Sequence, residues 1–279
     1  MAASFRFSTN QLHQEAINLL SQLIEIPSLS REEDKTADHL QAFFEGYEVP
    51  VERKGNNIWV RNANYDPEKP TILLNSHHDT VRPNVGYTKN PHQAIVEDGK
   101  LFGLGSNDAG GPLVCLIMTF MYFLNQKDLK YNLILAATAE EEISGAGGIR
   151  SILRELGEVD FGIVGEPTLM EMAINEKGLM VLDCYAHGQA GHAARDEGQN
   201  AIYNAIKDIE WFKAFSFPKE SETLGPVKMS VTVIEGGTQH NVVPDTCHFV
   251  VDVRTTDAYT NEETLEVIRS NVGCEVKER

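Results

Sequence analysis

The segment TILLNSHHD at residues 71–79 joins a short apolar run to two histidines and an aspartate. Two similar segments follow along the chain, NLILAATAEEE at 132–142 and FGIVGEPT at 161–168. Continuous apolar runs of this length, separated by helical stretches, are typical of strands that are buried on both faces of a parallel sheet. We therefore predict an α/β fold with a mainly parallel sheet, whose strands include 71–75, 132–137 and 161–164.

Acidic or imidazole side chains come directly after each of these apolar runs, and another lies in a glycine-rich loop. These residues are His77, Asp79, the run Glu140–Glu142, Glu166 and, in the loop, Asp108. In an open parallel sheet, ligands bind outside the carboxyl ends of the strands, so we expect these side chains to meet at one edge. Crowded carboxylates without matching lysines or arginines repel one another, and one or two divalent cations would relieve that repulsion.

The spacing of these residues suits a metal site. Residues two apart in an extended segment point the same way, so the Asp79 carboxylate can hold the second ring nitrogen of His77. His, Asp and Glu ligands suit zinc, although cobalt or manganese also fits. In the run of three glutamates, one can bind the ion while its neighbour acts as a general base toward water.

The pattern changes after about residue 173. We predict a strand at 178–186, a helix at 200–212, strands at 228–234 and 247–254, a helix at 261–269 and a strand at 274–277. This βαββαβ order indicates a compact antiparallel α+β module of the ferredoxin-like kind. We therefore expect two domains, at 1–172 and 173–279.

Two helices are expected to open the chain. Ser8-x-x-Gln11 and Ser30-x-x-Glu33 both fit a capping box, in which the serine and the residue three positions later satisfy exposed amides. The apolar run 113–124 contains 12 residues, well short of the roughly 20 that cross a bilayer. We interpret it as a buried helix and expect no association with a membrane.

Composition excludes several classes of protein. The chain has 279 residues, and 24 Lys and Arg against 41 Asp and Glu give a net charge of −17, which argues against a nucleic-acid partner. The N-terminal MAASFRFSTNQ lacks the features of a secretory signal. The four cysteines lie far apart, and we interpret them as reduced core residues of a cytoplasmic protein.

Taken in order, the motifs resemble those of the M20 metallohydrolase family, and within it the acetylornithine deacetylases. The matching segments are His77–Asp79, Gly105–Gly111, Glu140–Glu142, Gly165–Thr168, Gly191–His192, Asn200–Ile202, Gly236–Pro244 and Asp252–Arg254. They cover nearly the whole chain and are highly specific together. The resemblance implies a catalytic zinc-hydrolase domain over 1–172, into which a lid and dimerisation domain over 173–279 is inserted.

The resemblance also implies a role for each site residue. The metal ligands are His77 and Glu166 at a first ion, Glu142 at a second, and Asp108 as the bridge between them. Glu141 is the general base that takes a proton from the attacking water and passes it to the leaving amine. Asp79 orients His77. The implied cofactor is Zn²⁺ at two sites, with Co²⁺ as an alternative.

In this family the smaller domain forms a homodimer, and a histidine from the partner reaches the active site. His192 matches that histidine, which stabilises the tetrahedral oxyanion. Asn241 and Arg254 resemble the groups that hold the carboxylate of the substrate, the arginine by a two-pronged contact.

The sequence departs from the family pattern at several points. His78 occupies a position where a small residue is usual, Glu140 replaces an aspartate, and Arg195 lies near a usual proline. Family members return from the lid for a further segment that carries a second histidine ligand. This sequence ends at Arg279. We therefore expect the C-terminal part of the catalytic domain to be absent, and only Asp108 and Glu142 to remain at the second metal site.

The expected function is hydrolysis of the amide bond of an N-acyl amino acid. The resemblance favours N-acetylornithine, a substrate in arginine biosynthesis. N-acetylcitrulline, N-succinylornithine, N-succinyl-diaminopimelate and dipeptides remain as alternatives within the family. A catalytically dead relative that dimerises or binds a small molecule is the alternative from a different class.

Overall fold

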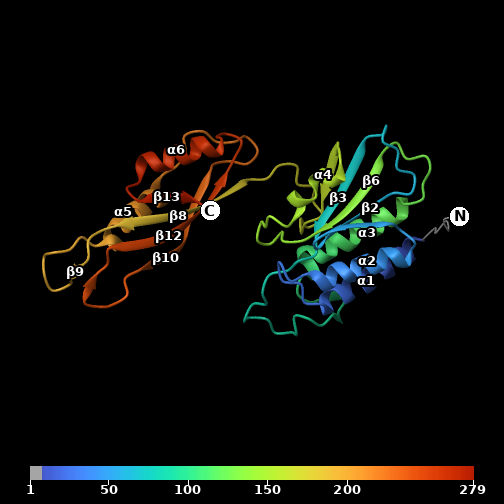
Figure 1. The fold of residues 1–279 in the computed structure, drawn as a ribbon, viewed down its shortest axis with the longest axis horizontal. Helices are drawn as coiled ribbons and strands as arrows, with labels where there is room; N and C mark the ends of the chain where they lie inside the picture. Colours follow the sequence, from blue (N-terminus) through green and yellow to red (C-terminus); the bar gives the residue numbers. More distant parts are fainter. Residues whose placement is uncertain (1–7) are drawn as a thin grey trace. The chain divides into compact units, whose positions relative to one another are not determined.

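The structure, a computed structural model, describes residues 8–279. The chain divides into two compact units, Met1–Glu171 and Met172–Arg279, and each has its own main sheet (Figure 1). Residues 1–7 lie outside the described residues. They include most of the N-terminal segment in which the sequence analysis expects no secretory signal. Within the described residues, no helix combines the length and the apolar character needed to cross a membrane.

The main sheet of the first unit has five strands in the order β1-β2-β6-β3-β7. These strands are β1 (Val51–Lys54), β2 (Asn57–Arg61), β3 (Thr71–His77), β6 (Asn132–Thr138) and β7 (Phe161–Val164). Strand β3 is parallel to both β6 and β7, whereas β2 runs antiparallel to β6. The predicted fold class, an α/β sheet that is mainly parallel, is therefore confirmed.

Helices cover both faces of this sheet. Three of them share one apolar core with every second residue of β6: α1 (Thr9–Glu25), α2 (Asp34–Gly46) and α3 (Gly111–Phe123). Its members include Leu40, Phe120 and Leu135. The alternate residues of β6, such as Ile134, pack on the other face with α4 (Leu153–Leu156). Strand β6 is buried at all its positions because both faces are covered.

Three sequence-based predictions are wrong in detail. Strand β7 is exposed at all four positions, because it forms an edge of the described sheet. Cys115 is exposed on the outer side of α3, although Cys184 and Cys247 are buried. The Ser8–Gln11 capping box is present, but Ser30 caps no helix. Helix α2 begins at Asp34 after Glu33, which makes no side-chain cap, and the Ser30 hydroxyl donates to Asp79 instead.

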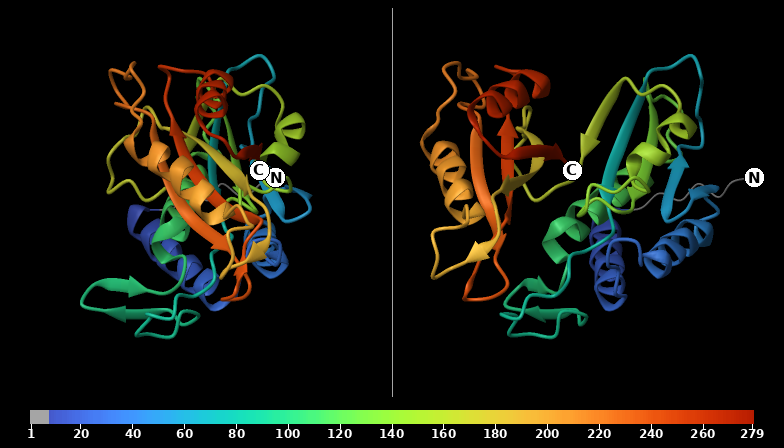
Figure 2. Two further views of the ribbon diagram at one scale, coloured as in Figure 1. Left: turned by 90° about the vertical axis from the view of Figure 1, so that its left-hand side faces the viewer. Right: turned by 60° about the vertical axis from the view of Figure 1, so that its left-hand side comes forward.

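The second unit is a four-stranded antiparallel sheet in the order β10-β12-β8-β13. Its strands are β8 (Gly178–His187), β10 (Lys228–Gly236), β12 (Thr246–Thr255) and β13 (Glu275–Glu278). The helices α5 (Ala201–Ala214) and α6 (Asn261–Asn271) pack beside it (Figure 2). Phe212 and Ile268 from these helices share a core with Phe249 and Val251 of β12. The element order matches the predicted βαββαβ module.

Short pieces were not predicted, because two or three residues carry too little periodicity. They are the hairpin of β4 (Ile95–Glu97) with β5 (Lys100–Phe102), the pair β9 (Gly191–His192) with β11 (Val242–Val243), and the helical turns Ser106–Gly110 and Ile149–Ser151. The pairing of β9 with β11 brings two motif segments of the second unit side by side.

The sheet of the second unit carries a charge cluster around Asp183 on β8. The carboxylate accepts hydrogen bonds from His248 Nε2 at 2.8 Å and from Arg279 Nη2 at 2.7 Å. Arg279 and then His248 lower the pKa of Asp183 from 3.8 to about 2. Because the pKa is depressed in the folded state, the stabilisation is present above about pH 4 and is lost as the pH falls toward 2.

We predict that Asp183→Asn lowers the free energy of unfolding by about 1 kcal/mol at pH 7, a modest value because the pair is partly exposed. The gap to the wild-type chain should close between pH 4 and pH 2. Urea unfolding followed by circular dichroism at a series of pH values measures it. Asp257→Asn, at an exposed carboxylate outside the cluster, is the matched control. A gap that is independent of pH would contradict the assignment.

Candidate metal centre

The first unit places the predicted acidic and imidazole residues at one edge of its main sheet. His77 is the last residue of β3, the glutamate run 140–142 follows β6, and Glu166 follows β7. Asp108 lies in the turn Ser106–Gly110 that leads into α3. Because β3, β6 and β7 are mutually parallel, their carboxyl ends point the same way and bring these side chains together.

The buried imidazole of His77 is the centre of this group. Its Nε2 atom lies 3.2 Å from Asp108 Oδ1, 3.8 Å from Glu141 Oε2 and 4.0 Å from Glu166 Oε2. One ligand atom each from His77, Asp108 and Glu142 lie within 4.8 Å of one another. The His77 side chain is fully buried, while those of Asp108 and Glu141 are more than half exposed. The carboxylates therefore face solvent around one fixed nitrogen.

The other ring nitrogen of His77 is fixed by Asp79. His77 Nδ1 lies 2.9 Å from the backbone carbonyl oxygen of Asp79 and 3.4 Å from its Oδ1 atom. Both the backbone carbonyl and the carboxylate of Asp79 therefore face this nitrogen, and the carbonyl is the nearer of the two. The carboxylate accepts from Ser30 Oγ at 2.7 Å and from the backbone amides of Glu141 and Glu142 at 3.0 and 3.2 Å.

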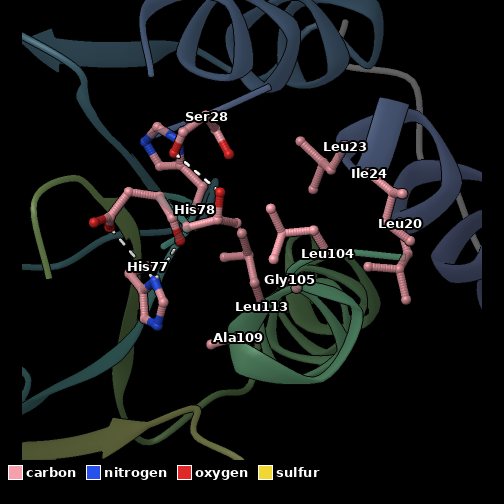
Figure 3. Close-up of a pocket in the computed structure, with 13 residues that line it drawn as sticks. Leu20, Leu23, Ile24, Ser28, His77, His78, Leu104, Gly105, Ala109 and Leu113 are labelled. Atoms are coloured by element: carbon pink, nitrogen blue, oxygen red, sulfur yellow. Dashed lines mark hydrogen bonds and ion pairs between the residues drawn. The ribbon is translucent and has the colours of Figure 1, made fainter. Parts of the chain in front are cut away.

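The neighbouring histidine points away from the site. Figure 3 shows the rings of His77 and His78 on opposite sides of the strand end. His78 is buried, its Nδ1 lies 2.8 Å from Thr36 Oγ1, and its Nε2 donates to the Asn56 carbonyl at 2.9 Å. Burial lowers the pKa of His78, so the ring is neutral and Nδ1 accepts from the hydroxyl. His78 therefore has a structural role. Its ring points away from His77 and does not occupy the space around the candidate metal ligands.

The electrostatics of the site favour positive charge. Burial lowers the pKa of His77, but the hydrogen bond and charge of Asp79 and the charges of nearby glutamates outweigh it and raise the pKa to about 9. Burial raises the pKa of Glu166 to about 7, opposed by His77 and assisted by Glu141. Burial and the charge of Asp108 also raise the pKa of Glu142. The raised pKa values mean that His77 and Glu166 favour their protonated forms, so the site is suited to binding positive charge.

These residues fit a divalent metal ion. For ligand atoms at roughly 2.1 Å from a tetrahedral zinc, neighbouring ligands lie roughly 3.4 Å apart, close to the observed separation of His77 Nε2 and Asp108 Oδ1. The third member of the tight group is Glu142 rather than Glu166, although Glu166 Oε2 lies only 4.0 Å from the same nitrogen. One imidazole with several carboxylates is a donor set suited to zinc, cobalt or manganese.

The remaining predicted site residues belong to the second unit. His192 lies on β9 opposite Val242, and the amide of Ala193 donates to the carbonyl of Asn241 at 3.0 Å, so His192 and Asn241 are neighbours. Arg254 lies near the other end of β12, and its guanidinium binds Asp252 at 2.9 and 3.1 Å. The eight residue steps from Thr246 to Arg254 span about 26 Å of extended strand. Asn241 comes before the start of β12, and Arg254 lies near its end.

Three residues that support the backbone at the start of the glutamate run 140–142 were not predicted from the sequence. Ser30, Glu33 and Asn57 each contact Asp79 or the backbone at 139–140. The capping pattern assigned Ser30 and Glu33 to a helix end, and no sequence motif includes Asn57. The proximity of Asn57 to the glutamate run depends on the pairing of β2 with β6, which no local pattern indicates.

Comparison with known proteins agrees with this geometry. Residues 174–278 match the peptidase dimerisation domain of the M20 family. A peptidase M20 domain-containing protein of Schizosaccharomyces pombe is 30% identical over 262 residues, which cover 91% of this chain and 62% of that protein. An acetylornithine deacetylase of Myxococcus xanthus is 28% identical over 214 residues, covering 73% of this chain and 55% of that enzyme. The chain thus spans about three fifths of the length of these relatives.

A solved structure agrees at the level of the fold. An M20 family metallo-carboxypeptidase from Sulfolobus solfataricus matches with a TM-score of 0.74 at 17% identity, over 95% of this chain and 78% of that one. The structural match covers both units of this chain, and the family model covers the second unit. Residues 174–278 therefore match the dimerisation domain of the M20 peptidases, and the chain as a whole is similar to proteins of that family.

Proposed function

We propose that this protein is a metal-dependent hydrolase of amide bonds, a deacylase or a peptidase, and that its preferred substrate is an N-acyl amino acid. The observation that carries this proposal is the fully buried His77 nitrogen with the carboxylates of Asp108, Glu141 and Glu166 within 4.0 Å. Within the described residues, the group of His77, Asp108 and Glu142 is the one that combines three such ligand types closely enough for an ion.

In this proposal His77, Asp108, Glu142 and Glu166 would hold zinc or cobalt at up to two sites. A bound ion would polarise the amide carbonyl and lower the pKa of water. Glu141 is the general base. Its carboxylate is about half exposed and lies 3.8 Å from His77, so it reaches the solvent side of the centre while Glu142 faces the ligands. It takes a proton from the attacking water and passes it to the leaving amine.

The second unit would supply the substrate contacts from two subunits. His192 and Asn241 lie together, whereas Arg254 lies near the end of β12, about 26 Å from the start of that strand. We propose that His192 and Asn241 of one subunit act in the site of the other, where His192 stabilises the oxyanion. Arg254 would then bind the substrate carboxylate from its own subunit. The dimerisation-domain match supports this homodimer.

N-acetylornithine, and with it a place in arginine biosynthesis, is the substrate that we favour, because the Myxococcus xanthus relative is an acetylornithine deacetylase. The Sulfolobus solfataricus structure is a carboxypeptidase, so a peptide substrate is the second candidate. N-acetylcitrulline, N-succinylornithine and N-succinyl-diaminopimelate differ only in the acyl or amino acid part. A dead relative that keeps the fold without the activity is the remaining alternative.

The first test is zinc titration of the chain by isothermal calorimetry. We expect at least one tight ion per chain, because His77, Asp108 and Glu142 converge, and we expect tight binding to be lost in His77→Ala. Circular dichroism confirms that the variant is folded. Val85→Ala, at a fully exposed side chain of the same unit, is the control and should bind like the wild type. A folded wild-type chain that binds no zinc would contradict the proposal.

The second test separates metal binding from catalysis. Glu141→Gln should retain zinc but lower kcat by about 10²–10⁴-fold, the range expected for loss of a general base. Hydrolysis of N-acetylornithine, N-succinyl-diaminopimelate and a set of dipeptides is followed by release of free amine. Full turnover by Glu141→Gln would refute the assigned role. A wild-type chain that binds zinc and hydrolyses none of these substrates would favour the dead relative.

The third test concerns the dimer. Strand β10 is an edge of the second unit's sheet and exposes Val233 and Ile234, whereas the opposite edge, β13, is charged and poorly suited to pairing. We expect sedimentation velocity to show a dimer that Ile234→Lys converts to a monomer. Val96→Lys, at an exposed apolar residue on β4 of the first unit, should leave the dimer intact. A wild-type monomer at working concentration would contradict the action of His192 across subunits.

A further inference from the structure

The acidic turn, defined as residues 139–142, is held by side chains rather than by a neighbouring strand. Each of its four consecutive backbone amides donates to a side-chain oxygen from elsewhere in the first unit. The pairs are Ala139 with Asn57 Oδ1 at 3.0 Å, Glu140 with Glu33 Oε1 at 3.0 Å, Glu141 with Asp79 Oδ1 at 3.0 Å and Glu142 with Asp79 Oδ2 at 3.2 Å. A continuous row of this kind leaves no amide of the turn without an acceptor.

The three acceptor residues are themselves fixed. Glu33, Asn57 and Asp79 are each at most 1% exposed. Glu33 Oε2 accepts from Asn56 Nδ2 at 3.2 Å, and Asn57 Nδ2 donates to the Gly147 carbonyl at 2.6 Å. The acceptors also come from three separate places: the start of α2, the start of β2 and the residue pair after β3. The position of the acidic turn is therefore determined from several sides.

The turn needs such support for two reasons. Glu140 has a φ of 53°, a left-handed conformation that is unfavourable for a residue with a side chain. Three successive glutamates also place like charges side by side, close to Asp108 and Glu166, and their repulsion favours an open turn. The amide–oxygen bonds oppose both effects, and they do so at the backbone, so the carboxylates of Glu141 and Glu142 stay available.

We propose that Glu33 and Asn57 are positioning residues for the metal centre, acting through the backbone of the acidic turn. They touch neither an ion nor a substrate. By fixing the amides of Ala139 and Glu140, they set where the next two residues present their carboxylates. The effect on the metal centre rests on the proposed function, whereas the effect on the turn itself does not.

The chain provides a matched control for Asn57. Strand β2 is flanked by buried asparagines, Asn57 at its start and Asn62 just after its end. Asn57 Oδ1 accepts from the Ala139 amide beyond the carboxyl end of β6, and Asn62 Oδ1 accepts from the Leu133 amide at 2.9 Å near its amino end. The two side chains make the same kind of bond to the same strand, but only one lies beside the acidic turn.

The experiment compares Asn57→Ala with Asn62→Ala in the full chain. Both should lower Tm, because each leaves a buried amide without its acceptor, and Asn57→Ala should lower it more, since it also removes the bond from Asn57 Nδ2 to the Gly147 carbonyl. Only Asn57→Ala should weaken zinc binding in calorimetry, by about 10–100-fold, the range for loss of a group that orients a ligand. In hydrogen exchange read by mass spectrometry, only Asn57→Ala should speed exchange at the acidic turn.

Glu33 is tested by Glu33→Ala and Glu33→Gln. The glutamine keeps one oxygen for the Glu140 amide, so it should bind zinc within a few-fold of the wild type, whereas the alanine should resemble Asn57→Ala. If Glu33→Ala does not fold, the comparison of the two asparagines still decides the question, since both retain Glu33. Equal zinc affinity in Asn57→Ala and Asn62→Ala would overturn the proposal.

The readouts also separate this inference from the proposed function. If the wild-type chain binds no zinc, the metal-dependent function fails, and hydrogen exchange still tests whether Asn57 and Glu33 hold the acidic turn. Unchanged exchange at residues 139–142 in both Asn57→Ala and Glu33→Ala would overturn the positioning role, whatever the chain binds.

Discussion

Repulsion among carboxylates is the constraint on which the rest of the first unit depends. Five of them, those of Asp79, Asp108, Glu141, Glu142 and Glu166, lie around or next to the ring of His77. Proteins rarely gather such groups without a compensating positive charge, because each added charge raises the free energy of the others. The pKa of about 9 for His77 expresses this, because Asp79 and the nearby glutamates outweigh the effect of burial. For Glu166, burial is the main cause of the pKa of about 7, and the charges of the neighbouring carboxylates add to it.

The directions of the strands determine where these charged residues and their hydrogen-bond partners lie. Strands β3 and β6 are parallel, so their carboxyl ends deliver His77 and the acidic turn to one edge. Strand β2 is antiparallel to β6, with Ile58 opposite Ala137, so the start of β2 lies where β6 ends. Asn57 can therefore reach the first amide of the turn. A single antiparallel strand at the edge of a parallel group thus places a neutral acceptor where a charged one would add to the repulsion.

Much of this could be predicted from the sequence, for a physical reason. Buried strands such as β6 have no polar face, so their continuous apolar runs identify them directly, and the polar residues after each run identify the functional edge. The order of elements in the second unit follows from alternation and helical periodicity in the same way. These signals are local, and each can be interpreted from fewer than about ten residues.

The parts that could not be predicted depend on contacts that are distant in sequence. Ser30 and Glu33 carry a capping signature, yet their side chains bind Asp79 and the Glu140 amide, 49 and 107 residues away. Strand β7 has the composition of a buried strand and lies at the sheet edge, because strand order is not encoded in any one segment. The positions of Asn241 and Arg254 relative to each other likewise depend on how β12 pairs with its neighbouring strands, and a local sequence pattern does not specify that pairing.

His78 connects these observations. Its ring lies on the far side of the strand end from His77 and is bonded at both nitrogens, to Thr36 of α2 and to the carbonyl of Asn56. Those partners lie in the two segments that carry Glu33 and Asn57. A smaller residue at this position would remove both of these hydrogen bonds. The imidazole that departs from the family pattern therefore ties the support of the acidic turn to the strand that presents His77, and it remains neutral because burial lowers its pKa.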